Sequence, residues 1–478
     1  MRAALLLVLV PSIAAAGTYE IGPGDDLFGR LRMLAPGDEV IVHAGTYTTP
    51  GFFEVAWAGT EAAPIVVRGA DGERPVIAGT LAQNVIDLSG SYFTLRGFEL
   101  RGGSHGIRLG STDHAVLEDL VLHDLGDVGI SCNRPGLACA AITIRGCEIF
   151  DTGKAGTGEG MYLGCNDGDC AFTDAIVERN YVHDLGGDQG DGIEVKTGAT
   201  AVTVRDNVIA RSRFPGITMY GYTGAGAVNV VERNLVLDAG DNGIQIVGQV
   251  RVRNNLVLGS VGNGIHSKAS QGLIPDDVEI VHNTVVGAGG ACLKTNDWAL
   301  ATTTGQLIAN NALYCPAGTA VDLNGGAPAA RLSANVGLGA STAADGFFAG
   351  RSVEEDFDDV AALDFYPAAA GPLHGTGDPM YATADDFDGC PREEQIDVGI
   401  YDRTVAGRAW IVAEGFKPAP TCHGSVGPDA GPEGEPGSGR GGCCDSGARG
   451  SGSLVLAIAV LASRRRRRAT ASTHGRPV

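Results

Sequence analysis

The sequence is poor in aromatic and charged residues, which make up 6% and 19% of the chain. Basic residues are outnumbered, with 35 lysines and arginines against 56 aspartates and glutamates, so the formal net charge is −21. A chain with this balance lacks the basic face that phosphate binding requires, which argues against a nucleic-acid partner. The net charge also repels an acidic polysaccharide at long range. Because salt screens this repulsion over about 8 Å, local patches of charge determine whether such a polymer binds.

The same composition limits the possible fold classes. With few aromatics and few charges but 73 glycines, it suits many short strands joined by tight turns and argues against a helical protein. A length of 478 residues would correspond to two or three ordinary domains. Internal repeats allow one long body instead, because a solenoid grows in one dimension.

The first residues have the layout of a secretory signal peptide. A positive charge at Arg2 is followed by the apolar run Ala3 to Val10, then by Pro11 and three alanines, and cleavage is expected near Ala16. A buried N-terminal strand is the alternative. The mature protein is therefore expected to leave the cytoplasm.

The sequence lacks paired C-x-x-C motifs, so its eleven cysteines do not have the spacing of a zinc site. In an exported protein, cysteines favour disulfides over free thiols. Two pairs flank the short loops CNRPGLAC and CNDGDC, and two looser pairings follow along the chain. The expected disulfides join Cys132 with Cys139, Cys165 with Cys170, Cys292 with Cys315, and Cys390 with Cys422, leaving Cys147 over.

A repeat runs through the middle of the chain in phrases such as RGFEL, ERNYV, RDNVI and RNNLVL. The residues before each apolar pair recur every 21 to 33 positions, at Gly97, Asp119, Cys147, Asn180, Asn207, Asn234, Asn255, Asn283 and Asn311. Spacings of this size are typical of the coils of a β-solenoid. The recurrent asparagines are interpreted as a ladder of stacked side chains bonded along a turn.

A second ladder, of glycines followed by apolar residues, runs in phase with the first. Each coil is expected to turn at its glycine and then to begin a strand whose first residue points inward. The residues predicted to stack in the core are Ile107, Ile130, Met161, Ile193, Ile217, Ile244 and Ile265. About ten parallel coils are expected between residues 36 and 345.

Two segments resemble the pectate lyase-like β-helix superfamily. Residues 25–34, DDLFGRLRML, have helical spacing and precede PGDEVIVHAGTY, and such a helix followed by this pattern opens many members. Residues 386–403, DFDGCPREEQIDVGIYDR, resemble the closing segment of many bacterial β-helix proteins. The expected fold is all-β, a right-handed parallel β-helix over residues 17–410 with a short N-terminal capping helix.

The composition changes after this domain. Residues 411–442 form a linker rich in glycine and proline, and residues 443–478 contain Cys443, an apolar stretch from Leu454 to Ala462 and an arginine cluster. This end resembles the C-terminal sorting tag of myxobacterial surface proteins, which implies removal of the helix and attachment through Cys443. The apolar stretch is short against the roughly 20 residues that span a bilayer. A basic disordered tail is the alternative.

In a strand, alternate residues point outward, so the second and fourth positions after each ladder glycine form columns on the exposed face. Adjacent coils lie about 4.8 Å apart, so equivalent side chains are neighbours. Polar side chains concentrate in three successive coils, at Glu159, Tyr162, Asp188, Asp191, Glu194, Lys196, Arg213 and Tyr220.

Carboxylates at that spacing repel one another unless a cation joins them. Ca²⁺ is the natural partner of such oxygen ligands, with Glu159, Asp191 and Glu194 as the leading ligands and Asp188 in reserve. A solvated acidic face that binds no ion is the alternative.

Lys196 on this face suggests chemistry beyond binding. To break a uronate chain by β-elimination, a base takes the proton alpha to a carboxylate while a cation or donor neutralises that carboxylate. Lysine becomes such a base when nearby positive charge favours its neutral form. Arg213 or a bound Ca²⁺ is expected to supply that charge.

The segment GDGIEVKTGATAVTVRDNVI resembles the region of chondroitinase B-type and alginate lyases that carries the catalytic lysine. The resemblance implies that Lys196 is that lysine and that Asp191 is a calcium ligand. Two positions depart from the family: its second calcium carboxylate falls on Gln189, and its catalytic arginine falls on Tyr220. Tyrosine can donate a proton to a leaving oxygen, so Tyr220 is the candidate acid.

The other outward positions predict contacts to an extended polymer, most plainly an acidic polysaccharide. The candidate substrate-binding residues are Tyr162, Asn133, Arg108, His266 and Lys268. Two alternatives stay open. Glu159 and Asp191 on consecutive coils suit a glycoside hydrolase, with an epimerase in the same class, and a surface module can bind glycan without any chemistry. A monomer at the outer surface of a Gram-negative cell, or released from it, is expected.

Overall fold

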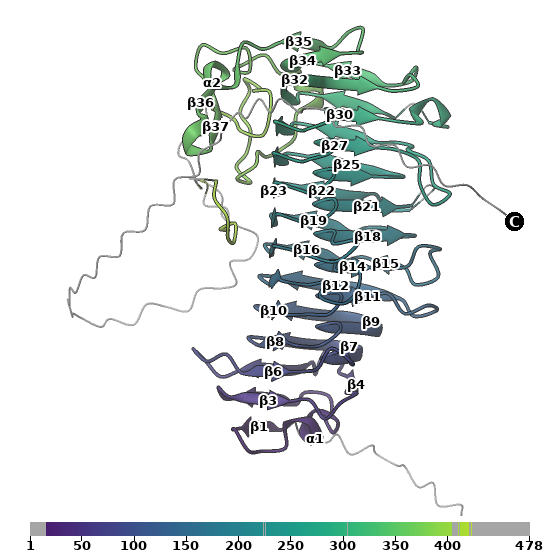
Figure 1. Cartoon of the computed structure of the whole chain (residues 1–478), viewed down its shortest axis with the longest axis vertical. Coiled ribbons are helices and arrows are strands. Elements are labelled where there is room, and N and C mark those ends of the chain that lie inside the picture. The colour runs from purple at the N-terminus through teal and green to yellow at the C-terminus, as the bar shows by residue number, and fades with distance from the viewer. Residues whose placement is uncertain are drawn as a thin grey trace, which may run out of the picture. The chain divides into compact units, whose positions relative to one another are not determined.

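A computed structural model describes residues 16–222, 224, 226–303, 305–403, 410, 412–419 and 422, all within the unit Met1–Ser425. The chain winds into coils of short strands that lie one above another (Figure 1). The predicted signal peptide up to residue 15 and the predicted tag with Cys443 lie outside the described residues. No helix of the described part is long and apolar enough to cross a membrane.

Corresponding strands of successive coils pair in parallel and form three faces, called the first, second and third sheets in the order in which a coil visits them from residue 54 onward. Five strands bend from one sheet into another or extend toward it: β7 (Ile86–Arg96), β9 (Ile107–Glu118), β12 (Cys139–Arg145), β32 (Ala312–Leu323) and β34 (Asn335–Ser341). The first sheet adds β4 (Glu54–Ala58), β11 (Ile130–Cys132), β14 (Met161–Leu163), β18 (Ile193–Thr197), β21 (Ile217–Gly221), β24 (Ile244–Ile246), β27 (Ile265–Ser267) and β30 (Ala291–Thr295).

The second sheet contains β1 (Thr18–Ile21), β2 (Glu39–Val42), β5 (Ile65–Gly69), β16 (Ile176–Glu178), β19 (Thr203–Arg205), β22 (Asn229–Glu232), β25 (Val250–Arg253), β28 (Glu279–Val281), β31 (Leu307–Ala309) and β33 (Arg331–Ser333). The third contains β3 (Thr46–Thr48), β6 (Val76–Ala78), β8 (Glu99–Arg101), β10 (Val121–His123), β13 (Glu148–Phe150), β17 (Tyr181–His183), β20 (Val208–Ala210), β23 (Leu235–Leu237), β26 (Leu256–Leu258), β29 (Thr284–Val286) and β35 (Phe347–Ala349). A short strand, β15 (Phe172–Thr173), pairs in parallel with the start of β12. Outside these sheets lie α1 (Leu27–Leu31), α2 (Val353–Asp356), η1 (Trp298–Leu300), η2 (Val360–Ala362), η3 (Pro379–Tyr381) and the antiparallel pair β36 (Phe357–Asp359) and β37 (Asp364–Pro367).

The predicted register of the glycine ladder is confirmed. The seven apolar residues after the glycines pair coil to coil in the first sheet, from Ile107 to Ile265, and each is completely buried. Because side chains alternate along a strand, this register fixes which residues face outward. The protein is an all-β parallel β-helix, as predicted.

The asparagine ladder is also confirmed, at the turn between the second and third sheets. Each asparagine Oδ1 accepts from the backbone N–H of the equivalent residue one coil earlier, as in the 3.0 Å bond from Asn180 N to Asn207 Oδ1. The ladder continues beyond Asn311 to Asn335. Cys147 occupies the position before Asn180 as a free thiol, and burial raises the pKa of that thiol to about 12.

The N-terminal end begins earlier than the sequence suggested. A strand, β1, precedes the helix and pairs with β2 from Thr18 opposite Glu39, so residues 36–47, which contain β2 and the start of β3, do not open the fold. Helix α1 is only five residues long, with Leu27 and Leu31 buried against the core. Strand β1 was missed because a strand of four residues is too short to show a period.

The four expected disulfides are present: Cys132–Cys139, Cys165–Cys170, Cys292–Cys315 and Cys390–Cys422. The first two close short loops that follow strands of the first sheet. The last joins the segment that resembles a β-helix closing segment to residue 422, beyond the expected end of the domain.

The described residues from 353 to 419 form a C-terminal cover over the outer side of the third sheet. Buried outward residues of that sheet, such as Val208, Leu235 and Leu256, pack against it. The covering side chains are Phe357, Phe365, Tyr366, Leu373, Phe387, Val398, Ile400, Tyr401 and Val412.

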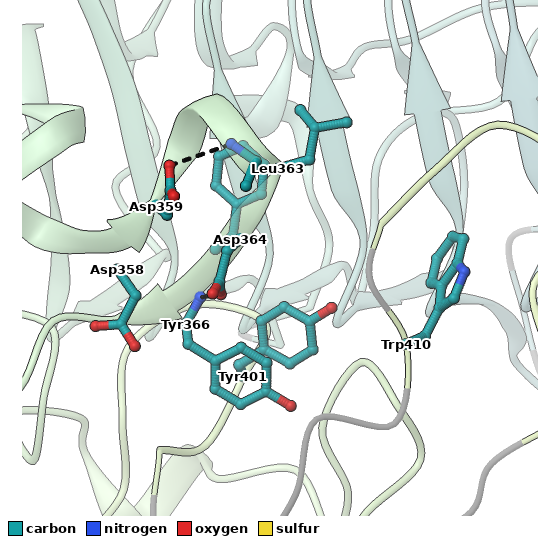
Figure 2. Close-up of a pocket in the computed structure, with 9 residues that line it drawn as sticks. Asp358, Asp359, Leu363, Asp364, Tyr366, Tyr401 and Trp410 are labelled. Atoms are coloured by element: carbon teal, nitrogen blue, oxygen red, sulfur yellow. Dashed lines mark hydrogen bonds between the residues drawn. The ribbon is translucent and has the colours of Figure 1, made fainter. Parts of the chain in front are cut away.

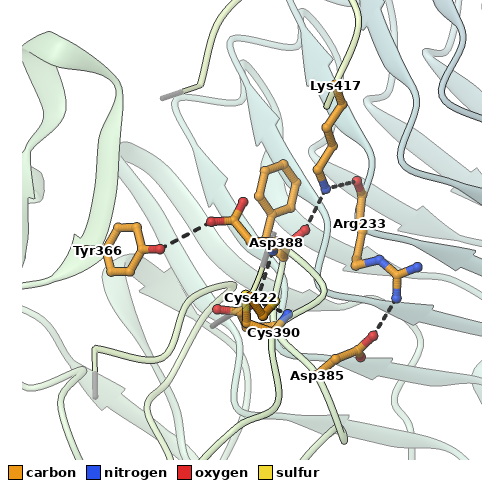
Figure 3. The surroundings of a disulfide bond; sticks show 9 residues. Arg233, Tyr366, Asp385, Asp388, Cys390, Lys417 and Cys422 are labelled. Carbon is orange, nitrogen blue, oxygen red and sulfur yellow. Dashed lines mark hydrogen bonds and ion pairs between the residues drawn. A yellow bond between two sulfur atoms is a disulfide. The ribbon is translucent and has the colours of Figure 1, made fainter. Parts of the chain in front are cut away.

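Buried cations hold the cover in place beside the disulfide Cys390–Cys422 (Figure 3). Lys417 Nζ donates to the carbonyl oxygen of Arg233 at 2.8 Å and contacts Asp206 Oδ1 at 3.1 Å. Arg392 lies in the predicted closing segment, and its guanidinium donates to the backbone carbonyl of Gly399 at 2.8 Å. These bonds explain the charged residues of that segment as structural.

Candidate functional site

The outward columns of the first sheet have the predicted alignment. Tyr162, Glu194, Thr218 and Gln245 are paired in register on successive strands β14, β18, β21 and β24. The middle of this surface is not solvated, however. Glu194 is 6% exposed and Lys196 is 4% exposed, so polar side chains here cover one another.

Lys196 lies at the centre of the polar cluster. Its Nζ donates to Glu194 Oε1 at 2.7 Å. The same ammonium lies over the ring of Tyr162 at 4.9 Å and over that of Tyr220 at 4.4 Å from the centroid. Both rings therefore present their negative faces to the cation, which stabilises a desolvated ammonium.

Gly164 allows this close approach. Its φ is +104°, and a Cβ at this position would lie 3.1 Å from the Cβ of Lys196. A side chain at residue 164 would therefore be strained and would crowd the lysine.

Three buried carboxyl groups surround the lysine, and burial raises the pKa of each. The pKa of Glu159 rises to about 7, with the charge of Glu194 adding to the effect of burial and a hydrogen bond from Thr157 opposing it. For Asp191, burial and then the charge of Glu194 raise the pKa well above its ordinary value. Burial raises the pKa of Glu194 too, against the effect of Lys196. The cluster thus retains protons at pH values where exposed carboxyl groups have lost them.

The two tyrosines are also perturbed. Burial, with Glu194 and Asp191 adding, raises the pKa of Tyr220 to about 12. Burial and the charge of Glu194 likewise raise the pKa of Tyr162. Both hydroxyls are therefore protonated at neutral pH and can donate.

The expected calcium ligands do not lie close enough together to form a calcium cage. Among the described residues, one group of three acidic, histidine or cysteine side chains has its ligand atoms within 4.8 Å of one another, namely Cys165, Asp169 and Cys170. Both of those sulfur atoms are in a disulfide. The carboxylates of Glu159, Asp191 and Glu194 are spread more widely than a calcium cage requires. Their arrangement does not fit the ion as it stands, and calcium binding stays a prediction.

A cleft of about 340 Å³ joins several predicted site residues on the face of the coils that hold Lys196. It brings together Asp188, Asp191, Glu194, Tyr220 and Lys268, and also Gln189. The residues that line it and were not singled out from the sequence are Phe214, Pro215, Asp241 and Gln245. Gln245 follows a ladder glycine by two positions, so the column pattern carried the signal for it.

Other predicted site residues lie farther along the coils or outside the cleft. Arg108 Nε donates to Asn133 Oδ1 at 3.0 Å, and these residues lie three and two coils before Glu194. His266 Nε2 contacts Asn296 Oδ1 at 2.8 Å on the opposite side. Arg213 is exposed in the turn before β21, and its side chain has no hydrogen bond or ion pair with a described residue.

A chain of polar contacts that ends at Glu159 was missed. Ser131 Oγ lies 3.0 Å from His105 Nδ1, and His105 Nε2 lies 3.4 Å from Asp127 Oδ2. Thr157 Oγ1 donates to Asp127 Oδ1 at 2.8 Å and contacts Glu159 Oε2. Burial lowers the pKa of His105 to about 4, so the imidazole is neutral. Asp127 and Thr157 lie outside the columns that follow the ladder glycines, and the sequence therefore gave no signal for them.

A second cleft, of about 480 Å³, lies within the C-terminal cover and is lined by acidic and aromatic residues (Figure 2). Its polar groups already have structural partners. Asp359 caps the η2 helix through Ala362 N, and Asp358 pairs with Arg403 at 2.8 Å. Tyr366 and Tyr401 stack at 4.0 Å between centroids. These contacts make the second cleft a feature of the cover rather than of the polar cluster around Lys196.

Residues 84–313 match the family model described as right handed beta helix region. No curated protein sequence matches the chain. Among solved structures, pectate lyase Pel9A is 15% identical, with a TM-score of 0.51 over 82% of this chain and 98% of its own. The PL6 family alginate lyase AlyGC is 16% identical, with a TM-score of 0.50 over 74% of this chain and 55% of its own. This chain thus spans about half the length of AlyGC.

An alginate lyase from Paenibacillus sp. str. FPU-7 is 19% identical, with a TM-score of 0.43 over 59% of this chain and 94% of its own. The TM-scores of 0.51 and 0.50 for pectate lyase Pel9A and AlyGC show a shared fold. With its parallel coils, its ladders and the model matched over residues 84–313, the chain has the right-handed parallel β-helix fold.

Proposed function

We propose that the protein binds an extended, uronate-containing polysaccharide along the first sheet and cleaves it by β-elimination. The observation that carries the proposal is the enclosure of Lys196 between Tyr162 and Tyr220, with its ammonium on Glu194. A lysine so deeply held on an outward column is a group placed for chemistry rather than for solubility.

In this mechanism Lys196 is the base and Tyr220 the acid. Transfer of a proton from Nζ to the buried Glu194 leaves a neutral amine, which then takes the proton alpha to the substrate carboxylate. The electron pair forms the new double bond, the glycosidic C–O bond breaks, and the leaving oxygen receives the hydroxyl proton of Tyr220. Lys268, across the cleft, neutralises the substrate carboxylate as enolate charge develops.

The test is product chemistry. Purified mature protein is offered alginate, pectate, dermatan and a neutral glycan, each with calcium and with a chelator. Elimination gives an ultraviolet-absorbing unsaturated product from at least one acidic polymer. Absence of that absorbance from every polymer, with or without calcium, contradicts the lyase.

Hydrolysis is the second candidate, because Glu159 and Asp191 occupy equivalent positions on consecutive coils and both have raised pKa values. A raised pKa is what a general acid of a glycosidase needs. New reducing ends without ultraviolet absorbance identify this reaction. Binding of an intact polymer identifies a non-catalytic module instead.

We also propose export and surface attachment, which rest on the two chain ends. In the native host the mature chain should lack residues 1–16 and the arginine cluster from Arg464 to Arg468, and should be held at the cell surface through Cys443. Mass spectrometry of the mature protein checks both ends. A soluble periplasmic form that retains the cluster contradicts the attachment.

A further inference from the structure

Two loops from distant coils meet beside Lys196. The loop after β14 contains Asn166, and the loop after β27 contains Gln271; both project from the same edge of the coils (Figure 1). Gln271 Nε2 donates to Asn166 Oδ1 at 3.1 Å, and its Oε1 accepts from Thr197 Oγ1 at 2.9 Å. Gln271 therefore bridges the two loops across Thr197, the residue that follows Lys196.

Both ends of this bridge are rigid. The disulfide Cys165–Cys170 closes the first loop. The second loop ends in a tight turn closed by two backbone hydrogen bonds of 3.1 and 2.9 Å. In that turn Gln271 and Gly272 have φ values of 48° and 78°, a conformation that favours asparagine or glycine. A positive φ is unfavourable for glutamine, so its retention at this position indicates that the side chain of Gln271 has a function.

Each end of the bridge also reaches one of the tyrosines over the lysine ammonium. The hydroxyl of Tyr162 donates to Asn166 Oδ1 at 3.1 Å. In the tight turn, Ser270 forms a hydrogen bond with Tyr220 that opposes the rise of the Tyr220 pKa caused by burial. One amide side chain thus connects the two loops that hold both rings.

We propose that Gln271 is a positioning residue of the site, which locks the two loops so that Tyr162 and Tyr220 enclose Lys196. The inference rests on the proposed function in one respect, because positioning matters for turnover only if Lys196 acts on a substrate. The geometric part is independent of any reaction. Without the bridge, the rings separate and the ammonium becomes accessible from the side of the loops.

The first test measures accessibility without a substrate. Lysines of the folded protein are reductively methylated, and peptide mass spectrometry gives the rate at Lys196 relative to exposed Lys154. Gln271→Ala should raise that relative rate about tenfold, because two hydrogen bonds are lost. Gln249→Ala is the matched control, since Gln249 makes an exposed hydrogen bond to Gly224 N in a neighbouring loop. An unchanged rate in Gln271→Ala overturns the proposal.

The second test uses the polymer that the wild type cleaves. Gln271→Ala and Asn166→Ala should each lower kcat about tenfold with little change in KM, since the ring geometry is altered and the rest of the groove is not. Asn166→Asp retains the acceptor oxygen for Tyr162 and Gln271 and should restore most of kcat. A loss in Asn166→Asp as large as in Asn166→Ala contradicts positioning through this oxygen.

The two tests separate the positioning role from the lyase itself. A wild type that cleaves nothing, together with faster methylation of Lys196 in Gln271→Ala, supports the bridge and removes the lyase. An active wild type whose methylation rate is insensitive to Gln271→Ala supports the lyase and removes the bridge.

Discussion

The outward faces of the first and third sheets are both buried in the middle coils, but by different means. On the third sheet, Val208, Leu235 and Leu256 are apolar and are covered by the distant C-terminal segment. On the first, Glu194 and Lys196 are charged and are covered by neighbouring polar and aromatic groups. Apolar cover contributes stability, whereas burial of carboxyl groups, shown by the raised pKa of Glu194, opposes it. The third face is therefore covered by structural contacts, and the first is the face on which we propose that the substrate binds.

The largest expected effect is on turnover. Lys196→Ala should lower kcat by about 10² to 10⁴, the usual contribution of a positioned base, while polymer binding is retained. The fold should survive, because Glu194, whose pKa burial already raises, takes up a proton when its partner is lost. Steady-state kinetics on the cleaved polymer give the result, with exposed Lys154→Ala as the control. An unaffected Lys196→Ala moves the chemistry to Glu159 and Asp191.

Substitutions in the cover of the third sheet should lower stability and leave turnover unchanged. Phe387 is completely buried in the C-terminal cover and lies 3.6 Å below the Lys417 ammonium. Phe387→Ala should lower the free energy of unfolding by about 3 to 5 kcal/mol without changing KM for the polymer. Urea unfolding measures this change in the free energy of unfolding. Phe348→Ala is the matched control, because Phe348 is 59% exposed. Equal effects of the two substitutions would show that the cover adds little stability.

Sequence alone was sufficient for the periodic part of this molecule. The inward residues from Ile107 to Ile265 and the asparagine ladder recur at coil spacing, and two of the four cysteine pairs follow from short loops, whereas the other two were looser pairings. The burial of Lys196 was not predictable in this way, because it depends on Tyr162 and Tyr220 from adjacent coils and on a loop some 70 residues away. The C-terminal cover was also missed, since its partners lie far apart in the sequence.

The free energy of unfolding should depend on pH because of Glu159, which lies beside the first sheet. The pKa of Glu159 is raised from 4.5 to about 7 in the folded state, so between these values the folded protein holds a proton that the unfolded chain has lost. Stability should therefore be greatest below pH 4.5 for this group, fall by up to about 3 kcal/mol as pH rises to about 7, and then level off.

Glu159→Gln should flatten that decline, because the amide does not titrate. Urea unfolding of both proteins from pH 4 to pH 8 gives the comparison, with exposed Glu61→Gln as the control. A decline in Glu159→Gln as steep as in the wild type would show that this carboxyl is already ionised.

The smallest expected effect is that of the tyrosine hydroxyl. Tyr220→Phe should lower kcat about tenfold and leave the unfolding free energy nearly unchanged, because only the proton donor is removed. Tyr222→Phe, at a ring 42% exposed, serves as the control. If kcat in Tyr220→Phe equals that of the wild type, another group protonates the leaving oxygen.

The central claim is that the polar first face performs elimination, and one paired measurement tests it most directly. Wild type and Lys196→Ala are incubated with the same acidic polymer, and the ultraviolet absorbance of unsaturated product is followed beside the amount of bound polymer. Absorbance should rise with the wild type only, and both proteins should bind the polymer equally. Equal binding with no absorbance from either protein would contradict this claim and leave a glycan-binding β-helix.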